Sequence, residues 1–216
     1  RKNGELFWEE AHIAPVFDSA GTVLQYIAVK LDITDRKKVE EQVTHLAQYD
    51  ALTDLPNRTL FSELLLQALA LAQRENNYLA VMFVDLDRFK PVNDTYGHAV
   101  GDLLLNQVGK RMRDTVRLSD TLGRVGGDEF VVLLPKVEGP SDALLVAEKL
   151  RLALEMPFTI EDHVLQISAC IGIALYPEHG LDEKTLFQHA DLAMYHAKQR
   201  GRNAVQLFDG QMVEVS

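Results

Sequence analysis

Along the chain, segments with short apolar runs alternate with segments in which apolar residues recur every three or four positions. Short continuous apolar runs are typical of buried strands, whereas apolar residues recurring every three or four positions indicate helices. The predicted strands are residues 80–85, 122–125, 130–134, 158–160 and 164–175. The predicted helices are residues 57–74, a segment from Gly101 onward, residues 140–154 and residues 182–200. This mixed order predicts an α/β sandwich with a partly antiparallel sheet.

The first part of the chain has a different pattern. Residues 6–17 and 22–33 are two strand-like runs joined by a turn. Two strands cannot bury a core alone, so we expect them to be the end of a larger domain. Residues 37–48 then form a charged helix with a narrow apolar stripe at Val39, Val43 and Leu46. The stripe fits a surface helix packed on its own domain or a short coiled coil, and it is too short to decide.

A pair of glycines stands between two of the predicted strands. Gly126 and Gly127 precede Asp128 and Glu129, and Phe130 opens the next apolar run. Paired glycines permit the positive φ angles of a tight hairpin turn and let a ligand approach the backbone closely. Two carboxylates beside such a turn suit a hard cation with oxygen ligands. An ordinary hairpin with a solvated acidic tip is the alternative.

A second acidic group follows the strand predicted at residues 80–85. Asp85 is expected at the end of that strand, where ligands gather, and there it could share a cation with Asp128. Asp87 reads equally well as a local capping or turn acid. The two acidic groups together predict a metal–nucleotide site.

Separated motifs then occur in a specific order. Residues 83–90 read FVDLDRFK, residues 93–98 read NDTYGH, Gly101-Asp102 follows, and residues 126–130 read GGDEF. Residues 49–58 and 190–203 add YDALTDLPNR and ADLAMYHAKQRGRN. In this order the motifs resemble the diguanylate cyclase family, whose catalytic domain is called GGDEF. The resemblance covers roughly residues 46–209 and implies a palm-like nucleotidyl cyclase sandwich with a central mixed β-sheet flanked by helices.

The resemblance implies condensation of two GTP molecules into cyclic di-GMP, a bacterial second messenger, with release of two pyrophosphates. Asp85, the carbonyl of Leu86 and Asp128 match the metal ligands, for two Mg²⁺ or Mn²⁺ ions per active site. Glu129 resembles the residue that assists metal binding or deprotonates the attacking hydroxyl, and its division of labour with Asp128 stays open. One GTP site per domain implies a homodimer for catalysis.

The resemblance also implies residues that bind the GTP phosphates. Lys90, Lys198 and Arg202 resemble the cations that hold the β- and γ-phosphates. Cations near a helix C-terminus are favoured by the helix dipole in any case, which is the structural alternative for Lys198 and Arg202. Gly126 and Gly127 are expected to line the substrate site.

Two further pairs of residues match family positions. Asn93 and Asp102 match the guanine-binding positions, where a carboxylate and an amide satisfy the edge of the base. A turn residue and a helix cap are their alternatives. Arg117 and Asp120, shortly before the glycines, resemble the site at which cyclic di-GMP acts as feedback inhibitor. A surface ion pair is the alternative there.

Charge and composition narrow the function classes. The 216 residues carry a formal net charge of −10, which argues against general nucleic-acid binding. An anionic substrate therefore needs local cations, and those near the motifs are Lys90, Arg117, Arg124, Lys198 and Arg202. The one cysteine, Cys170, lies in an apolar run and is expected to be a packed thiol. No apolar run approaches the ~20 residues that span a bilayer, so we expect a cytoplasmic segment, with any membrane anchor outside it.

The predicted domain organisation has four parts. Residues 1–36 resemble the C-terminal part of a PAS sensor domain, residues 37–48 are a linker helix, residues 49–209 are the GGDEF domain, and residues 210–216 begin a following linker. Residues 176–180 and 207–212 also resemble GGDEF domains that continue into an EAL phosphodiesterase domain. The alternative function is therefore a catalytically weak or inactive GTP-binding domain that regulates an attached EAL phosphodiesterase.

Overall fold

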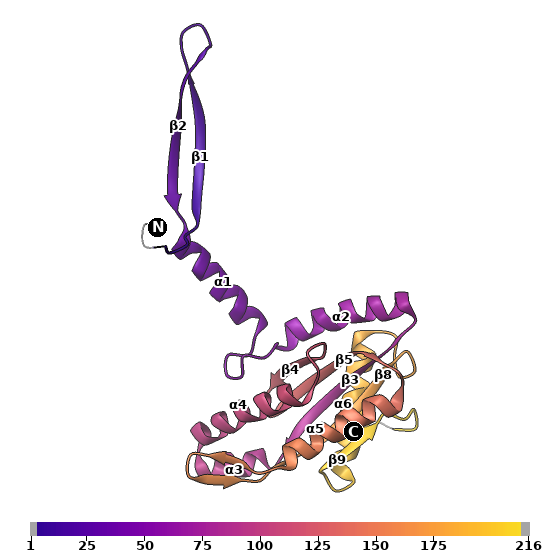
Figure 1. Cartoon of the computed structure of the whole chain (residues 1–216). Coiled ribbons are helices and arrows are strands. Elements are labelled where there is room, and N and C mark those ends of the chain that lie inside the picture. Colours follow the sequence, from indigo (N-terminus) through magenta and orange to yellow (C-terminus); the bar gives the residue numbers. More distant parts are fainter. Residues whose placement is uncertain (1–3, 213–216) are drawn as a thin grey trace. The chain divides into compact units, whose positions relative to one another are not determined.

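The computed structural model describes residues 4–212 and divides the chain into two compact units, Arg1–Ala47 and Gln48–Ser216. The first three residues of the predicted PAS segment and residues 213–216 of the predicted linker lie outside the described residues. The first unit holds an antiparallel hairpin and most of one helix (Figure 1). These elements are β1 (Glu9–Phe17), β2 (Val23–Asp32) and α1 (Thr34–Gln48).

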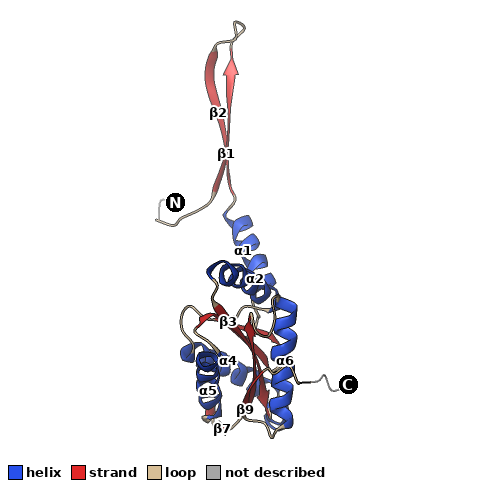
Figure 2. Cartoon of the chain, turned by 90° about the vertical axis from the view of Figure 1, so that its right-hand side faces the viewer, coloured by secondary structure: helices blue, strands red, loops and turns tan. Residues whose placement is uncertain are grey.

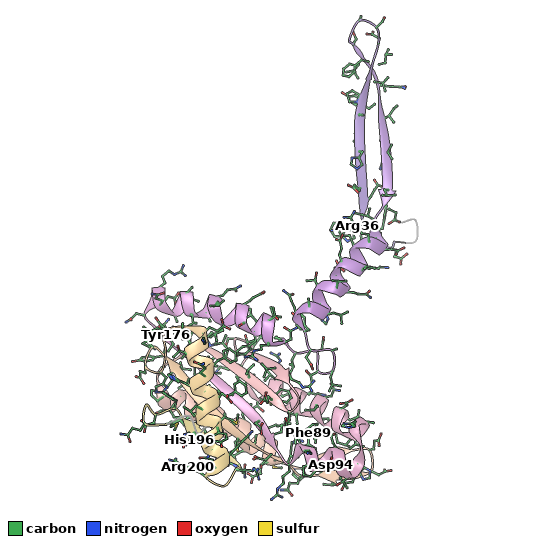
Figure 3. All side chains as sticks on the ribbon, turned by 180° about the vertical axis from the view of Figure 1, so that it is seen from behind. Arg36, Phe89, Asp94, Tyr176, His196 and Arg200 are labelled. Carbon is green, nitrogen blue, oxygen red and sulfur yellow. The ribbon has the colours of Figure 1, made fainter. Side chains whose placement is uncertain are left out.

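The hairpin of the first unit exposes apolar side chains. They project from the ribbon along both strands (Figure 3), and they include Ile13, Phe17, Leu24, Tyr26, Ile27, Val29 and Leu31. The Asp18 carboxylate fixes the connecting turn by accepting from the backbone N–H groups of Ala20 and Thr22, both at 2.8 Å. Local hydrogen bonds, not a buried core, therefore define this hairpin, as expected for two strands.

The second unit is built on a five-stranded sheet with the order β4-β5-β3-β8-β9. All neighbouring strands are antiparallel except β8 and β9, which are parallel. The strands are β3 (Tyr78–Asp87), β4 (Thr121–Gly126), β5 (Glu129–Val137), β8 (Ser168–Tyr176) and β9 (Ala204–Leu207). The mixed central sheet that the sequence predicts is confirmed.

Helices cover both faces of this sheet (Figure 2). One face packs on α2 (Arg58–Glu75) and α6 (Glu183–Gln199), and the other on α3 (Phe89–Tyr96), α4 (His98–Thr115) and α5 (Pro140–Glu155). The central strand β3 serves both faces because successive side chains point to opposite sides. Leu79 and Val81 join the α2 and α6 core, whereas Ala80 and Met82 join the other.

The structure corrects several predicted boundaries. The strand predicted at residues 164–175 is two strands, because β7 (His163–Leu165) pairs with β6 (Phe158–Ile160) and β8 pairs with β3. Strand β3 continues to Asp87, so Asp85 lies two residues before its end. Helix α4 begins at His98, ahead of Gly101, and α3 and β9 are elements that the sequence did not predict.

Candidate active site

The glycine turn joins β4 to β5. Gly126 pairs with Glu129 across the hairpin, so the two turn residues are Gly127 and Asp128, one position later than predicted. Both glycines have positive φ, at 152° and 49°, and both are exposed. Asp128 and Glu129 are partly buried beside them. The turn thus presents bare backbone next to two carboxylates.

Arg124 holds this turn from within the hairpin. Its Nε and Nη2 donate to the Gly127 carbonyl at 3.0 and 2.7 Å, and its Nη1 donates to Asp50 Oδ1 at 2.7 Å. Burial raises the pKa of Asp50, but hydrogen bonds from Thr53 and Arg124 outweigh it and leave the pKa below its ordinary value. Arg124, expected among the local cations, therefore positions the turn. Asp50 belongs to the YDALTDLPNR motif, but no role was predicted for it.

Two neighbouring strands and one helix bring the predicted catalytic residues together. Asp85 on β3 pairs in register with Glu129 on β5, and the N–H of Leu86 donates to the Asp128 carbonyl at 3.2 Å. Lys198, near the end of α6, places Nζ 2.6 Å from Asp85 Oδ2. The sheet register explains this convergence, because it aligns the Asp85 region with the glycine turn.

The carboxylates of Asp85, Asp128, Glu129 and Asp191 form an acidic cluster, and their charges repel one another. Burial raises the pKa of Asp85, the negative charges of Asp128 and Asp87 raise it further, and the Lys198 ion pair opposes both. Burial likewise raises the pKa of Glu129, with Asp85 and then Asp191 adding to the shift. The cluster thus holds more negative charge than Lys198 balances, which favours an additional cation.

Asp191 is the residue of this cluster that the sequence analysis missed. It lies on α6, seven residues and thus about two helical turns before Lys198. Its pKa is raised by partial burial, against the opposing charges of Lys198 and Arg58. Asp191 lies in the ADLAMY motif. Its spacing of two helical turns from Lys198, a predicted phosphate ligand, could have identified it from the sequence.

The donor set fits a divalent cation. Asp85, Asp128 and the Leu86 carbonyl offer oxygen alone, and Mg²⁺ is characteristically held by one or two carboxylates together with substrate phosphates and water. Among the residues that the structure describes, no group of three histidine, cysteine or acidic side chains is arranged to hold a metal by itself.

Asp87 has long-range partners, so its reading as a local capping or turn acid is wrong. It is buried, and its Oδ2 accepts from Ser168 Oγ at 2.8 Å and from the Asn203 N–H at 3.0 Å. Cys170 Sγ lies 3.3 Å from Oδ1, and Arg202 Nε lies 3.7 Å from the same oxygen. Asp87 therefore ties β3 to β8 and to the segment after α6.

Asn93 and Asp102 lie on consecutive helices. Asn93 is in α3, and its Oδ1 is buried with no hydrogen-bond partner among the described residues. A Cβ on Gly101 of α4 would overlap this oxygen, so the glycine permits the close approach of the two helices. Asp102 is exposed in the first turns of α4 and is not its cap, and Lys90 is exposed at the start of α3.

Arg117 and Asp120 form a separate site. Asp120 is buried and accepts from the Arg117 N–H at 2.9 Å, while the Arg117 side chain is exposed. A surface cavity of about 570 Å³ is lined by Arg117, Lys136 and Glu138. Strand β4 separates Asp120 from the turn at Gly126, a span of roughly 20 Å at strand rise. The structure thus does not bring this pair to the acidic cluster.

Comparisons with known proteins agree with this geometry. The family model described as "Diguanylate cyclase, GGDEF domain" matches residues 47–204. The bifunctional diguanylate cyclase/cyclic di-GMP phosphodiesterase MucR of Pseudomonas aeruginosa is 48% identical over 179 residues, which cover 83% of this chain and 26% of MucR. The diguanylate cyclase TpbB of the same species is 43% identical over 166 residues, which cover 76% of this chain and 38% of TpbB. The chain thus spans well under half the length of these relatives.

Solved structures share the fold. The crystal structure of the TpbB GGDEF domain has 42% identity and a TM-score of 0.71, and the match covers 73% of this chain and 98% of that one. The coiled coil and GGDEF domain of DgcB from Caulobacter crescentus, solved in complex with c-di-GMP, has 27% identity and a TM-score of 0.72. That match covers 81% of this chain and 93% of the DgcB chain.

Proposed function

The chain belongs to the GGDEF domain family of diguanylate cyclases, and from that premise we propose that it condenses two GTP molecules into cyclic di-GMP. In each half-reaction a ribose 3′-hydroxyl of one GTP attacks the α-phosphate of the other. A new P–O bond forms, the bond to pyrophosphate breaks, and the hydroxyl proton leaves. The observation that carries this proposal is the convergence of Asp85, Asp128, Glu129 and Lys198 at the glycine turn.

The residues divide the work of positioning and proton transfer. Glu129 is our candidate for the proton acceptor, because a carboxylate with a raised pKa holds a proton better near neutral pH than an ordinary one. Lys198 and Arg202 carry charges that suit the β- and γ-phosphates, with Lys90 on α3 as the third cation. In the free protein Lys198 pairs with Asp85, so the incoming phosphates would compete for it.

Members of this family generally use a divalent metal. We propose two Mg²⁺ or Mn²⁺ ions held by Asp85, Asp128 and the Leu86 carbonyl, which would offset the charge developing on the phosphates. The turn at Gly127 leaves room for the nucleotide beside these donors. The excess negative charge of the acidic cluster supports this assignment, since a cation would relieve it.

Asn93 and Asp102 are our candidates for guanine recognition. Asn93 is only partly buried, so its side-chain amide could turn toward a bound base, where Oδ1 would accept from an N–H of guanine. Asp102 on the exposed surface of α4 offers a carboxylate to the remaining donors of guanine. A base without those donors would leave these groups unpaired, which selects GTP over ATP.

Nucleotide chromatography tests the reaction. The chain is incubated with GTP and Mg²⁺, and Asp128→Asn is run beside it as the matched variant. We expect cyclic di-GMP from the wild type and a loss of roughly 10²-fold or more from the variant, because a charge at the reacting phosphates is removed. Turnover of the variant at the wild-type rate would remove Asp128 from the mechanism.

Feedback inhibition is proposed at the exposed Arg117 beside its surface cavity. An arginine fork gives bidentate contacts to phosphate or to guanine O6 and N7. Arg117→Ala should therefore raise the cyclic di-GMP concentration needed for inhibition without much change in the initial rate, because the site is separate from the turn. If cyclic di-GMP does not inhibit the wild type, the assignment of Arg117 to a feedback site is refuted.

The second candidate function is a GTP-binding module that regulates an EAL phosphodiesterase. Its support is the relative MucR, which is bifunctional and of which this chain covers only 26%. GTP bound without turnover in the chromatography would favour this function over the cyclase.

Among the described residues no helix combines the length and apolar character needed to cross a bilayer, and we propose a cytoplasmic location for this domain.

A further inference from the structure

The segment after α6 has an uncommon backbone. Gly201, Arg202 and Asn203 have φ angles of 120°, 65° and 46° in succession. Glycine adopts such angles freely, whereas other residues keep them only where their surroundings fix them. This segment leads directly from the end of α6, which carries Lys198, into β9. The contacts that fix it therefore bear on both proposed phosphate-binding cations.

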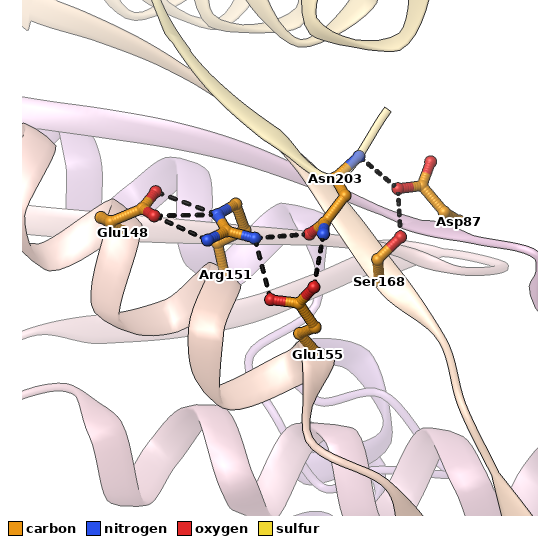
Figure 4. A network of polar contacts seen from close by, with 6 residues as sticks. All are labelled: Asp87, Glu148, Arg151, Glu155, Ser168 and Asn203. Carbon is orange, nitrogen blue, oxygen red and sulfur yellow. Dashed lines mark hydrogen bonds and ion pairs between the residues drawn. The ribbon is translucent and has the colours of Figure 1, made fainter. Parts of the chain in front are cut away.

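Asn203 is fixed by three hydrogen bonds from two directions (Figure 4). Its backbone N–H donates to Asp87 Oδ2 at 3.0 Å. Its side-chain Nδ2 donates to Glu155 Oε1 at 2.8 Å, and its Oδ1 accepts from Arg151 Nη1 at 2.7 Å. Arg151 and Glu155 belong to α5, a helix that supplies no residue to the acidic cluster. Asn203 is thus held between β3 and α5.

Arg151 is itself held in place by its own helix. Its Nε donates to both carboxylate oxygens of Glu148 at 3.0 Å, and its Nη1 donates to Glu155 Oε2 at 3.1 Å. The hydrogen bond to Glu148 is the largest of the interactions that raise the pKa of Arg151, so the guanidinium stays charged. Its side chain is only 14% exposed. The Arg151 guanidinium, fixed in this way, is pre-organised to donate to the Asn203 side-chain oxygen.

Arg202, the residue beside Asn203, has an exposed side chain that can reach a ligand. Its side chain is 66% exposed, and its Nε lies 3.7 Å from Asp87 Oδ1. A cavity of about 290 Å³ is lined by Arg202, Asn203 and Glu155, so the segment borders open space. If the hydrogen bonds to Asn203 were lost, the backbone of residues 201–203 could adopt other φ angles, and the Arg202 side chain would then point in a different direction.

We propose that Arg151 and Glu155 are positioning residues for triphosphate binding, which act through Asn203. They fix the left-handed segment and thereby set the direction of Arg202 and the end of α6 at Lys198. This inference rests on the proposed GTP site. Because these residues act only on the proposed β- and γ-phosphate ligands, they should affect GTP and leave GMP unchanged.

The test compares GTP and GMP binding by titration in Mg²⁺, followed by NMR or calorimetry. Asn203→Gly keeps the left-handed backbone accessible but removes the amide bonds, and Arg151→Met removes the fork but keeps much of the apolar stem. Arg74→Met, at a 75% exposed side chain on α2, is the matched control. We expect GTP affinity to fall about tenfold in Arg151→Met, which loses one hydrogen bond between Asn203 and a charged group, and at least as much in Asn203→Gly, which loses both side-chain bonds. GMP affinity and the control should match the wild type.

A double variant completes the design. Arg151→Met with Asn203→Gly should lose no more GTP affinity than Asn203→Gly alone, because that variant already removes the contact with Arg151. Unchanged GTP affinity in Asn203→Gly, additive losses, or equal loss of GMP and GTP affinity would overturn the proposal. Should Arg151→Met fail to fold, Asn203→Gly decides alone. If the wild type binds GTP without forming cyclic di-GMP, the cyclase function is refuted, and the binding data still decide the roles of Arg151 and Glu155. If the wild type binds no GTP, the cyclase function and these positioning roles are both refuted.

Discussion

Arg124 links the glycine turn to Asp50, a residue 74 positions away in the sequence. Arg124→Ala removes three hydrogen bonds and leaves the Asp50 carboxylate without its cation. We expect the free energy of unfolding to fall by about 1–3 kcal/mol, as for other bonds to charged groups, and cyclase activity to fall as well because the turn is released. Chemical denaturation and initial rates measure both effects, with Arg113→Ala at an exposed position of α4 as control.

The same pair predicts a pH dependence. The pKa of Asp50 in the folded protein lies below its ordinary value of 3.8, because its hydrogen bonds outweigh burial. The folded state thus binds fewer protons there, and the stabilisation is present above pH 3.8 and lost as pH falls through the folded pKa. The stability difference between wild type and Arg124→Ala should shrink below that pH. A difference that persists in acid would show that the charge of Asp50 is not involved.

Cys170 is expected to be inert in the folded protein. Burial raises the pKa of its thiol to about 12, and the charge and hydrogen bond of Asp87 contribute. The thiolate is the reactive form, so alkylation at pH 8 should be slow in the native protein and fast in denaturant. The thiol favours the folded state below its ordinary pKa of 9.0, and this stabilisation is lost as pH rises toward 12. Equal labelling rates in both states would contradict this prediction.

At the scale of elements, Gly172 sets how closely α6 packs on β8. A Cβ there would overlap the Ala190 carbonyl and the Met194 N–H, which are backbone atoms that cannot rotate away. Gly172→Ala should therefore push α6 from the sheet, lower the free energy of unfolding by about 1–3 kcal/mol, and weaken GTP binding because α6 carries Lys198. Thermal melts and GTP titration measure this, and Gly210→Ala, with open space around it, is the control. Matching results for the two variants would refute the packing argument.

Long elements with clear ends were predictable from the sequence. Helix α2 follows its Asn57 cap, and α6 follows Asp182, whose carboxylate accepts from the Thr185 N–H. Helix α3 was missed because eight residues with only Phe89 and Val92 buried carry little periodicity. Strand β9 was missed because its four half-buried residues are a strand through pairing with β8, a tertiary effect.

The candidate site was predictable to the extent that its residues lie within motifs. Asp85, Glu129 and Lys198 stand in separate motifs, and the sheet register together with α6 brings them together. The contact between Arg151 and Asn203 was not predictable, because it joins residues 52 positions apart and Arg151 lies in no recognised motif. Partners of this kind become visible only once the helices are packed.

At the scale of the whole molecule, the proposed reaction joins two GTP molecules, and this stoichiometry bears on the number of chains in the active enzyme. One domain offers one acidic cluster, yet cyclic di-GMP contains two nucleotides that each attack the other. We therefore propose that two chains meet with two-fold symmetry to form the product. Helix α1 is our proposed joining surface, because Val39, Val43 and Leu46 are each more than half exposed. Such a stripe of about two turns gives weak association by itself.

Specific activity should therefore rise with protein concentration and flatten once dimers dominate. Fusing a stable parallel coiled coil ahead of Val39, in a register that lets the domains face each other, should raise activity at low concentration. Shifting that register by two or three residues turns the domains apart and should lower activity again, although the chains remain dimeric. Light scattering on the same samples separates loss of association from loss of facing geometry. Constant specific activity from a chain that stays monomeric would rule out this mechanism, because one site would then complete both half-reactions.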